Sequence, residues 1–278
     1  MLAIEARWFG REGLWAEQSH WLERGLGGAR PVSPQTRAEA LFSAGAAAYS
    51  VGELEIAAKR TEQSLHLYRQ LGDDVALIRV LRNLGGLARL SGEHGRARSL
   101  LQESLRLAER LSNRRGVYRG LCWLGTLELD LGNLDVASDL FERSTALARE
   151  AGENGFLSEI LEGLGYVALL KHDVARATRI YADALRLSRD LGSPVTECLA
   201  GLAAVAAVTG DAERAGRLWG AVEVLERETY WLQSDRARYQ ELIETCSDLA
   251  PMAFAVAADR GRTMSPDAIL DYALADNG

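Results

Sequence analysis

The sequence predicts an all-α protein, a right-handed α-solenoid of stacked helix pairs that ends in a helical cap. The main observation is a period, because a turn position recurs every 38 to 40 residues, at Gly13, Gly52, Gly92, Gly132, His172 and Gly210. Composition agrees, since 47% of the 278 residues are hydrophobic and only five are proline. A fixed period of this size is typical of helical arrays in which each repeat contacts only its neighbours.

The period predicts six helix pairs over residues 1–228, the first of them truncated, and capping helices over 229–278. Only about ten residues precede Gly13, so the first helix is shorter than its later counterparts. A truncated helix at the end of a solenoid leaves apolar surface uncovered. We therefore expect the chain to be a fragment of a longer protein, or to pair with another surface at this end.

Local signals place the next helices. Ser33 and Pro34 suit an N-cap and a first helical position, and a second helix is expected from about residue 53 to 71. Gly72 followed by Asp73 suits the end of that helix and the start of the next. The third, fourth and fifth pairs are expected over about 75–111, 117–151 and 157–191.

Small residues recur inside each pair. Glycine or alanine in the first helix is expected to face alanine in the second, where helices approach closely, while larger residues fill the space towards the next pair. These larger residues are Leu101, Phe141 and Tyr181. Because His172 replaces a turn glycine, we expect its pair to be locally looser.

The sixth pair is expected at 196–208 and from 211 to about 228, after which the period is lost. Three short helices follow in the prediction, at 234–248, at 251–260 and from Ser265 to Tyr272. Helices of this kind after a repeat array are typical of a cap over its last apolar face.

Charge and cysteine content exclude several classes of protein. The formal charge of −7 argues against binding to nucleic acid through its phosphates. The three cysteines, Cys122, Cys198 and Cys246, are too far apart to indicate a disulfide framework, which favours a reducing cytoplasm. No apolar stretch is long enough for a signal peptide or a membrane span. A cytoplasmic protein without a membrane partner is therefore predicted.

The sequence carries no recognisable catalytic, cofactor or metal site. A phosphate-binding P-loop needs a lysine after glycine, and the only lysines, Lys59 and Lys171, follow alanine and leucine. The four histidines are not at metal-ligand spacing, and no cysteine pair has zinc spacing. We therefore predict a protein that is not an enzyme and binds no cofactor.

The repeat resembles the tetratricopeptide pattern, with glycine at its eighth and fifteenth places, alanine at its twentieth, and an aromatic residue or leucine at its twenty-fourth. The resemblance covers about residues 1–228, although the period is near 40 rather than 34. Two segments resemble bacterial signal-transduction ATPases of the NB-ARC/STAND type: residues 7–13 with 21–26 are similar to the start of their tetratricopeptide region, and residues 217–223 with residues further on are similar to the tail that ends them. That resemblance implies an upstream nucleotide-binding domain and an output domain, often a DNA-binding transcriptional domain or a cyclase. It also implies that the helical array acts as the sensor or autoinhibitory arm.

In this family the first helix of each pair lines the concave side, which yields a set of candidate ligand-binding residues. They are Tyr49, Arg79, Arg82, Asn83, Arg89, Arg119, Trp123, Glu159, Glu162 and Tyr166. Arg79, Arg82 and Asn83 are three and four residues apart and so share one helix face, and Arg119 is expected to face Arg79 from the next repeat. An arginine cluster with an amide donor suits a carboxylate, a phosphate or an acidic extended peptide. The alternative is a solvated polar face without a ligand.

Two functions remain open on this basis. The first is an effector-sensing or protein-interaction module of a cytoplasmic bacterial regulatory ATPase, which binds a peptide, a partner domain or a small anionic effector. The upstream domains of the same polypeptide could be that partner. The second is a free-standing adaptor that binds an extended acidic peptide.

Overall fold

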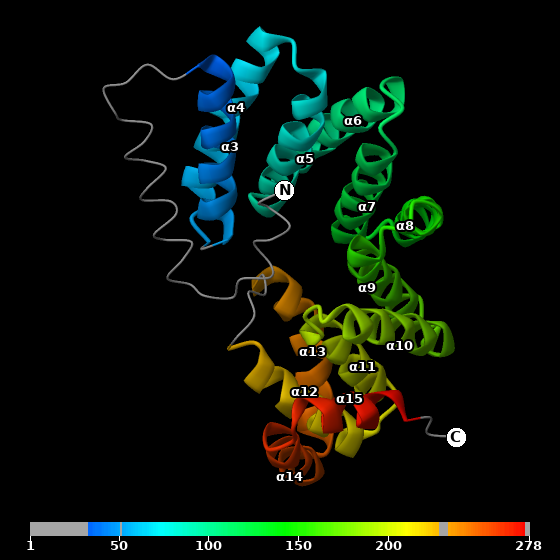
Figure 1. The fold of residues 1–278 in the computed structure, drawn as a ribbon. Coiled ribbons are helices and arrows are strands. Elements are labelled where there is room, and N and C mark those ends of the chain that lie inside the picture. Colours follow the sequence, from blue (N-terminus) through cyan, green and yellow to red (C-terminus); the bar gives the residue numbers. More distant parts are fainter. Residues whose placement is uncertain (1–32, 51, 228–232, 276–278) are drawn as a thin grey trace. The chain divides into compact units, whose positions relative to one another are not determined.

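The computed structural model describes residues 33–50, 52–227 and 233–275, and over these residues the secondary structure is entirely helical. In chain order the helices are α3 (Pro34–Ser50), α4 (Leu54–Leu71), α5 (Asp74–Leu90), α6 (His94–Arg110), α7 (Arg114–Asp130), α8 (Leu134–Glu150), α9 (Asn154–Leu170), α10 (Val174–Leu191), α11 (Thr196–Val208), α12 (Ala212–Leu225), α13 (Gln233–Leu249), α14 (Pro251–Arg262) and α15 (Pro266–Leu274) (Figure 1). The predicted all-α class is confirmed. The predicted first pair and the boundary at residue 228 lie outside the described residues.

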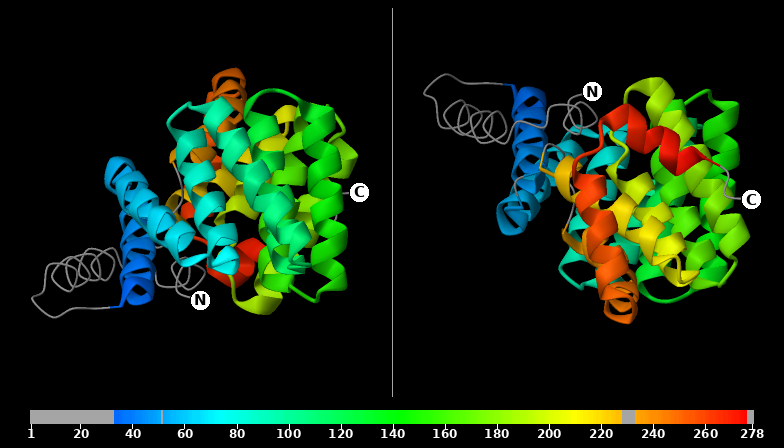
Figure 2. Two further views of the ribbon diagram at one scale, coloured as in Figure 1. Left: turned by 90° about the horizontal axis from the view of Figure 1, so that it is seen from above. Right: turned by 90° about the horizontal axis from the view of Figure 1, so that it is seen from below.

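The chain divides into two compact units, with unit 1 ending at Leu147 and unit 2 beginning at Ala148. Within unit 1, α3 packs on α4, α4 on α5, α5 on α6 and α6 on α7. Within unit 2 the same order runs from α9 to α12. First helices also contact one another directly, α5 with α7 and α9 with α11, and Figure 2 shows the helices from two further directions. Packing of consecutive helix pairs in this way is that of an α-solenoid.

The turns inside the pairs confirm the predicted period. Gly52, Gly92, Gly132 and Gly210 all have left-handed φ angles, between 75° and 81°. His172 adopts the same conformation at φ 59°, with its N–H donating to the Leu169 carbonyl oxygen at 3.0 Å, as in the glycine turns. The turn therefore keeps its geometry, and the expectation of a looser pair at His172 is wrong for the backbone.

Helix ends follow the predicted caps. The Asp73 carboxylate accepts a hydrogen bond from the Ala76 N–H at 3.0 Å, after Gly72 has ended α4 in the left-handed region. The Ser33 hydroxyl accepts from the Thr36 N–H at 3.1 Å. Helix α12 ends at Leu225, close to the predicted end near residue 228.

The small residues of the first helices make room for large side chains of the same pair. A Cβ placed on Gly85 would lie 2.7 Å from Leu101, and one on Gly165 would lie 2.9 Å from Tyr181. The expectation that these large residues fill the space towards the next pair is therefore incomplete, because they also cover the glycine of their own pair. Packing of this kind leaves no space for an added methyl group.

Buried serines join the two helices of each pair in unit 1, a feature that the sequence analysis did not anticipate. The hydroxyls of Ser64, Ser104 and Ser144 donate to first-helix carbonyl oxygens at 2.6 to 2.8 Å, each exactly spaced 26 residues from its acceptor. Because these donors are fully buried, the hydrogen bonds satisfy polar groups that would otherwise be costly in the core.

Candidate functional site

The first helix α5 is buried except for one stripe. From Ala76 to Arg89 every residue is buried apart from Arg79, Arg82 and Asn83, which are half-buried. These three positions share one face of the helix. Between Ala76 and Arg89, the predicted cluster of polar donors is therefore the part of α5 that solvent or a ligand can reach.

The next first helix, α7, adds two of the predicted residues. Arg119 and Trp123 are half-buried on a helix whose residues are otherwise mostly buried. The Trp123 ring lies directly on α5, because a Cβ placed on Gly86 would be 2.0 Å from it. Since α5 and α7 contact each other, we define Arg82, Asn83, Arg119 and Trp123 as the first-helix stripe of unit 1.

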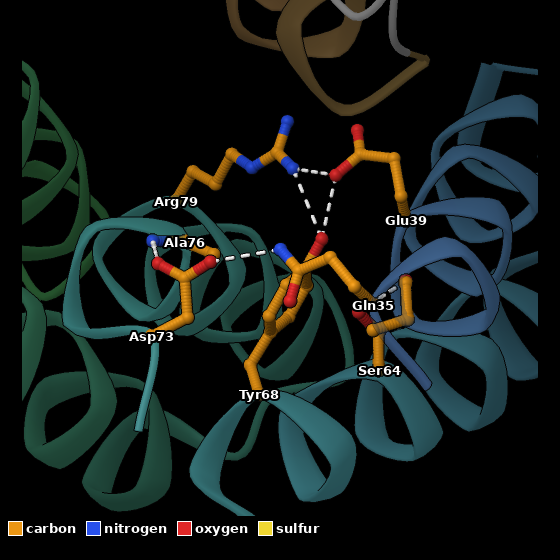
Figure 3. A network of polar contacts seen from close by, with 8 residues as sticks. Gln35, Glu39, Ser64, Tyr68, Asp73, Ala76 and Arg79 are labelled. Carbon is orange, nitrogen blue, oxygen red and sulfur yellow. Dashed lines mark hydrogen bonds and ion pairs between the residues drawn. The ribbon is translucent and has the colours of Figure 1, made fainter. Parts of the chain in front are cut away.

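Arg79 belongs to a network of its own (Figure 3). Its guanidinium pairs with the Glu39 carboxylate of α3, lies 3.3 Å from the Tyr68 hydroxyl and stacks on the Phe42 ring at 4.6 Å from the centroid. The Tyr68 hydroxyl donates to Glu39 at 2.6 Å. The sequence analysis predicted that Arg119 faces Arg79 from the next repeat. The structure shows in addition that Glu39, from the preceding repeat, compensates the charge of Arg79.

This network changes the acidity of its members. Partial burial disfavours the charged form of Glu39, but hydrogen bonds from Tyr68 and Arg79 outweigh it and lower the pKa of Glu39. Burial and the neighbouring Glu39 raise the pKa of Tyr68 to about 12. Glu39 stays ionised and Tyr68 stays protonated at neutral pH, so Arg79 retains its carboxylate partner.

Glu39 and Tyr68 were missed from the sequence, although one signal was present. Glu39 precedes Arg79 by 40 residues, which is one full repeat. Equivalent positions of adjacent first helices lie close together when these helices contact each other. A search for opposite charges one period apart would have found the pair.

Arg89 lies in the core rather than on the open stripe. Its side chain is 5% exposed and pairs with Asp130, which is 21% exposed, at 2.5 Å. The prediction that Arg89 is available to a ligand does not fit this burial. Its position on the helix explains the difference, since Arg89 lies near the C-terminal end of α5 and reaches the equivalent end of α7.

Tyr49, near the end of α3, is half-buried and packs against the apolar core of unit 1. A ligand can therefore reach only part of the Tyr49 side chain. The structure brings together Arg79, Arg82 and Asn83 on α5, and it places Arg119 and Trp123 on the adjacent α7.

In unit 2 the predicted residues Glu159, Glu162 and Tyr166 are all half-buried on α9. Glu162 accepts a hydrogen bond from the Ser158 hydroxyl at 3.3 Å and a contact from the Cys198 thiol at 3.5 Å. The Cys198 pKa is raised, chiefly by burial and then by Glu162. Glu162 therefore takes part in the packing between α9 and α11.

Helix α13 covers Tyr166, which the sequence analysis did not foresee. The Tyr166 hydroxyl donates to the Arg238 carbonyl oxygen at 3.2 Å, and its ring meets Tyr239 edge-on at 5.3 Å between centroids. A signal was present in α11, where the positions equivalent to Arg82 and Asn83, counted back from the turn glycines, are Ala200 and Gly201. Small apolar residues at these positions indicate a face that another segment covers.

The described residues contain neither a membrane-spanning helix nor a metal-binding cluster. No helix among them is both long and apolar enough to cross a membrane. Among the same residues, no three His, Cys, Asp or Glu side chains are grouped so that they could hold a metal ion.

Comparison with solved structures identifies helical repeat proteins. A Rap protein in complex with competence and sporulation factor matches with a TM-score of 0.63 at 15% identity, over 82% of this chain and 63% of that chain. Aspartyl phosphate phosphatase F from Bacillus subtilis matches with a TM-score of 0.57 at 12% identity, over 84% of this chain and 62% of that chain. The pilF protein of Pseudomonas aeruginosa matches with a TM-score of 0.52 at 14% identity, over 82% of this chain and 98% of that chain.

The chain thus spans less than two thirds of the length of the first two neighbours. No family model matches the sequence, and no curated protein matches it either. At these levels of identity the likeness shows the fold alone. The helix pairs, their left-handed turns and these structural neighbours together show that the chain is an α-solenoid of tetratricopeptide-like repeats.

Proposed function

We propose that the chain is a binding module without catalytic activity, whose first-helix stripe of unit 1 holds an anionic ligand. The observation that carries the proposal is the exposure pattern of α5, in which Arg79, Arg82 and Asn83 alone interrupt a buried run from Ala76 to Arg89. Burial of the remaining positions means that a ligand approaching α5 on this side meets guanidinium and amide groups.

The chemistry of the stripe selects the class of ligand. Arg79, Arg82 and Arg119 carry planar guanidinium groups that match carboxylate or phosphate groups in a bidentate way, and Arg79 makes such a contact with Glu39. Asn83 has both a donor and an acceptor, which suits the main chain of an extended peptide. The Trp123 ring adds an apolar surface for a side chain. An acidic extended peptide satisfies all of these groups, and a small anionic effector satisfies part of them.

Similarity in fold supports a binding role but does not identify the ligand. One structural neighbour is described in complex with competence and sporulation factor, and another is named as a phosphatase. The phosphatase name does not extend to this chain, because the likeness at 12% identity is one of fold.

For the wider context we propose the sensor arm of a cytoplasmic bacterial regulatory ATPase that controls transcription. The support is the resemblance of residues 7–13 to the start of the tetratricopeptide region of that family, and of residues 217–223 to its tail. The coding sequence upstream of residue 1 tests this: a P-loop domain there is expected, and its absence from the full reading frame would contradict it. The free-standing adaptor is then the alternative.

A peptide array tests the binding role directly. Acidic, neutral and basic peptides are probed with the wild-type protein and with Arg82→Glu at one salt concentration. We expect acidic peptides to bind the wild type and not the variant, because a like charge on the stripe repels them. Arg106→Glu is the matched control, since Arg106 lies exposed on the second helix α6. Equal binding by both variants would refute the site.

A further inference from the structure

Helix α13 lies on the first-helix face of unit 2. Its Tyr239 ring meets Tyr166 of α9 at 5.3 Å and Tyr181 of α10 at 6.4 Å between centroids, both edge-on. The Tyr181 and Tyr239 hydroxyls are 3.2 Å apart, and α13 also packs on α11. In unit 2, therefore, a segment of the chain occupies the face that corresponds to the stripe of unit 1.

The sequence of α11 fits this occupant. Counted back from the turn glycines Gly92 and Gly210, the α11 positions equivalent to Arg82 and Asn83 are Ala200 and Gly201, and both are buried. The position of Arg79 is taken by Glu197, which is half-buried. On the opposing side, the buried residues of α13 are spaced at i, i+4 and i+7. They are Tyr239, Ile243 and Cys246. This spacing is that of an amphipathic helix docked into an apolar groove.

Tyr181 reaches the face because two glycines flank its ring. A Cβ placed on Gly165 of α9 would lie 2.9 Å from Tyr181, and one on Gly201 of α11 would lie 2.2 Å from it. The ring of this second-helix residue thus passes between two first helices, and its hydroxyl meets Tyr239 on the far side. The contact with α13 is built into the packing of the fifth and sixth pairs.

The two neighbouring C-terminal helices are held in different ways. The backbone of α14 touches that of α12, since a Cβ on Gly216 would lie 2.4 Å from the Phe254 carbonyl oxygen and one on Gly220 would lie 2.1 Å from that of Ala258. Helix α13, by contrast, packs through the side chains of Tyr239, Ile243 and Cys246, and it makes far fewer contacts with α11 and α12 than α14 makes with α12. Elements with few buried contacts open first in native proteins.

A polar contact near the start of α13 completes its docking. Arg236 binds Glu226 through two hydrogen bonds, at 2.8 and 3.4 Å, and its guanidinium lies 5.4 Å from the centre of the Trp219 ring. Both charged side chains are partly exposed, at 29% and 23%. This ion pair can be broken by charge reversal without disturbing the core.

We propose that the first-helix face of unit 2 is a helix-binding site, that α13 is its resident ligand, and that α13 undocks as a unit while α14 stays in place. The site then receives a helix with the same pattern of one aromatic and two smaller apolar side chains. This inference goes beyond the binding role proposed for unit 1 and stands without it.

The test uses a fluorescent synthetic peptide of residues 233–249 and the full-length protein. Resident α13 competes with the peptide, so the apparent affinity of the wild type is reduced by the small fraction of undocked molecules. Arg236→Glu should raise that affinity by about tenfold or more, because it repels Glu226 and increases the undocked fraction. The swap Arg236→Glu with Glu226→Arg restores the ion pair, and with a peptide that carries the same Arg236→Glu change it should return the affinity to the wild-type level.

Two controls keep the result open to refutation. A peptide with Tyr239→Ala and Ile243→Ala should not bind Arg236→Glu, and binding equal to that of the unsubstituted peptide would overturn the proposal. Hydrogen exchange of the wild type needs no substitution at all. Amides of residues 237–249 should exchange faster than those of 252–261, whereas equal protection of the two segments would overturn separate undocking of α13.

Discussion

Replacing His172 with glycine should stabilise the protein. His172 has a φ of 59°, and a left-handed conformation costs a residue with a Cβ about 1–2 kcal/mol. Glycine avoids that cost but loses about 0.5–1 kcal/mol more backbone entropy on folding. The net result is a gain of about 0.5–1 kcal/mol in the free energy of unfolding.

The imidazole itself is not expected to contribute much, because His172 is exposed at a turn. His172→Ala removes the ring and keeps the Cβ, so it serves as the matched control and should not stabilise. Gly132→Ala is the reverse experiment: with φ at 76°, the substitution should destabilise by about 1 kcal/mol or more.

Urea denaturation followed by circular dichroism measures these changes as shifts of the midpoint at constant slope. Ser112 has a φ of 50°, and Ser112→Gly should give a similar gain for the same reason. A His172→Gly protein no more stable than His172→Ala would refute the reasoning, since it would show that the turn stores no strain.

Three further substitutions test the packing and the polar network. Arg89→Ala should cost about 1.5–3 kcal/mol, because it removes a buried side chain and its charge-assisted hydrogen bond to the partly exposed Asp130, and an unchanged free energy of unfolding would contradict a structural ion pair. Gly201→Ala should cost about 1–3 kcal/mol because the new Cβ would lie 2.2 Å from Tyr181; an unchanged melting temperature would contradict the close approach. Glu39→Gln should destabilise at neutral pH. Because the folded pKa of Glu39 is lowered, this difference should be full above 4.5, the ordinary value, and shrink as the pH falls below it; a pH-independent difference would contradict the network.

Much of the fold could be predicted because glycine and alanine recur in the sequence at a fixed period. The turn at His172 was located by counting alone, and the structure gives it the same left-handed φ as the glycines. The geometry of the turn comes from the helices on either side, which constrain His172 even though it is not the preferred residue. The histidine in place of a turn glycine therefore did not indicate a change in the backbone of this turn.

The candidate site could be predicted in part. Helical periodicity identified the positions of Arg82 and Asn83, because one face of a first helix must stay open when the others pack. It did not identify the partners of those positions. These partners come from neighbouring repeats: Glu39 pairs with Arg79, and Asp130 pairs with the buried Arg89. Their roles depend on how adjacent helices align.

The covering of Tyr166 by α13 was the hardest feature to foresee. Residues after 228 no longer follow the period, so counting could not place them on the array. The change to Ala200 and Gly201 in α11 indicated a covered face, but it could not say which segment covers it. The contact itself required three-dimensional information.

Photo-crosslinking tests the central claim most directly. An acidic peptide selected on the array is made with a photoreactive residue at its centre, irradiated with the wild-type protein, and the labelled residues are identified by mass spectrometry. The account predicts labels on α5 and α7, around Arg82 and Trp123, that are lost in Arg82→Glu. Labels confined to the second helices α4 and α6 would contradict it.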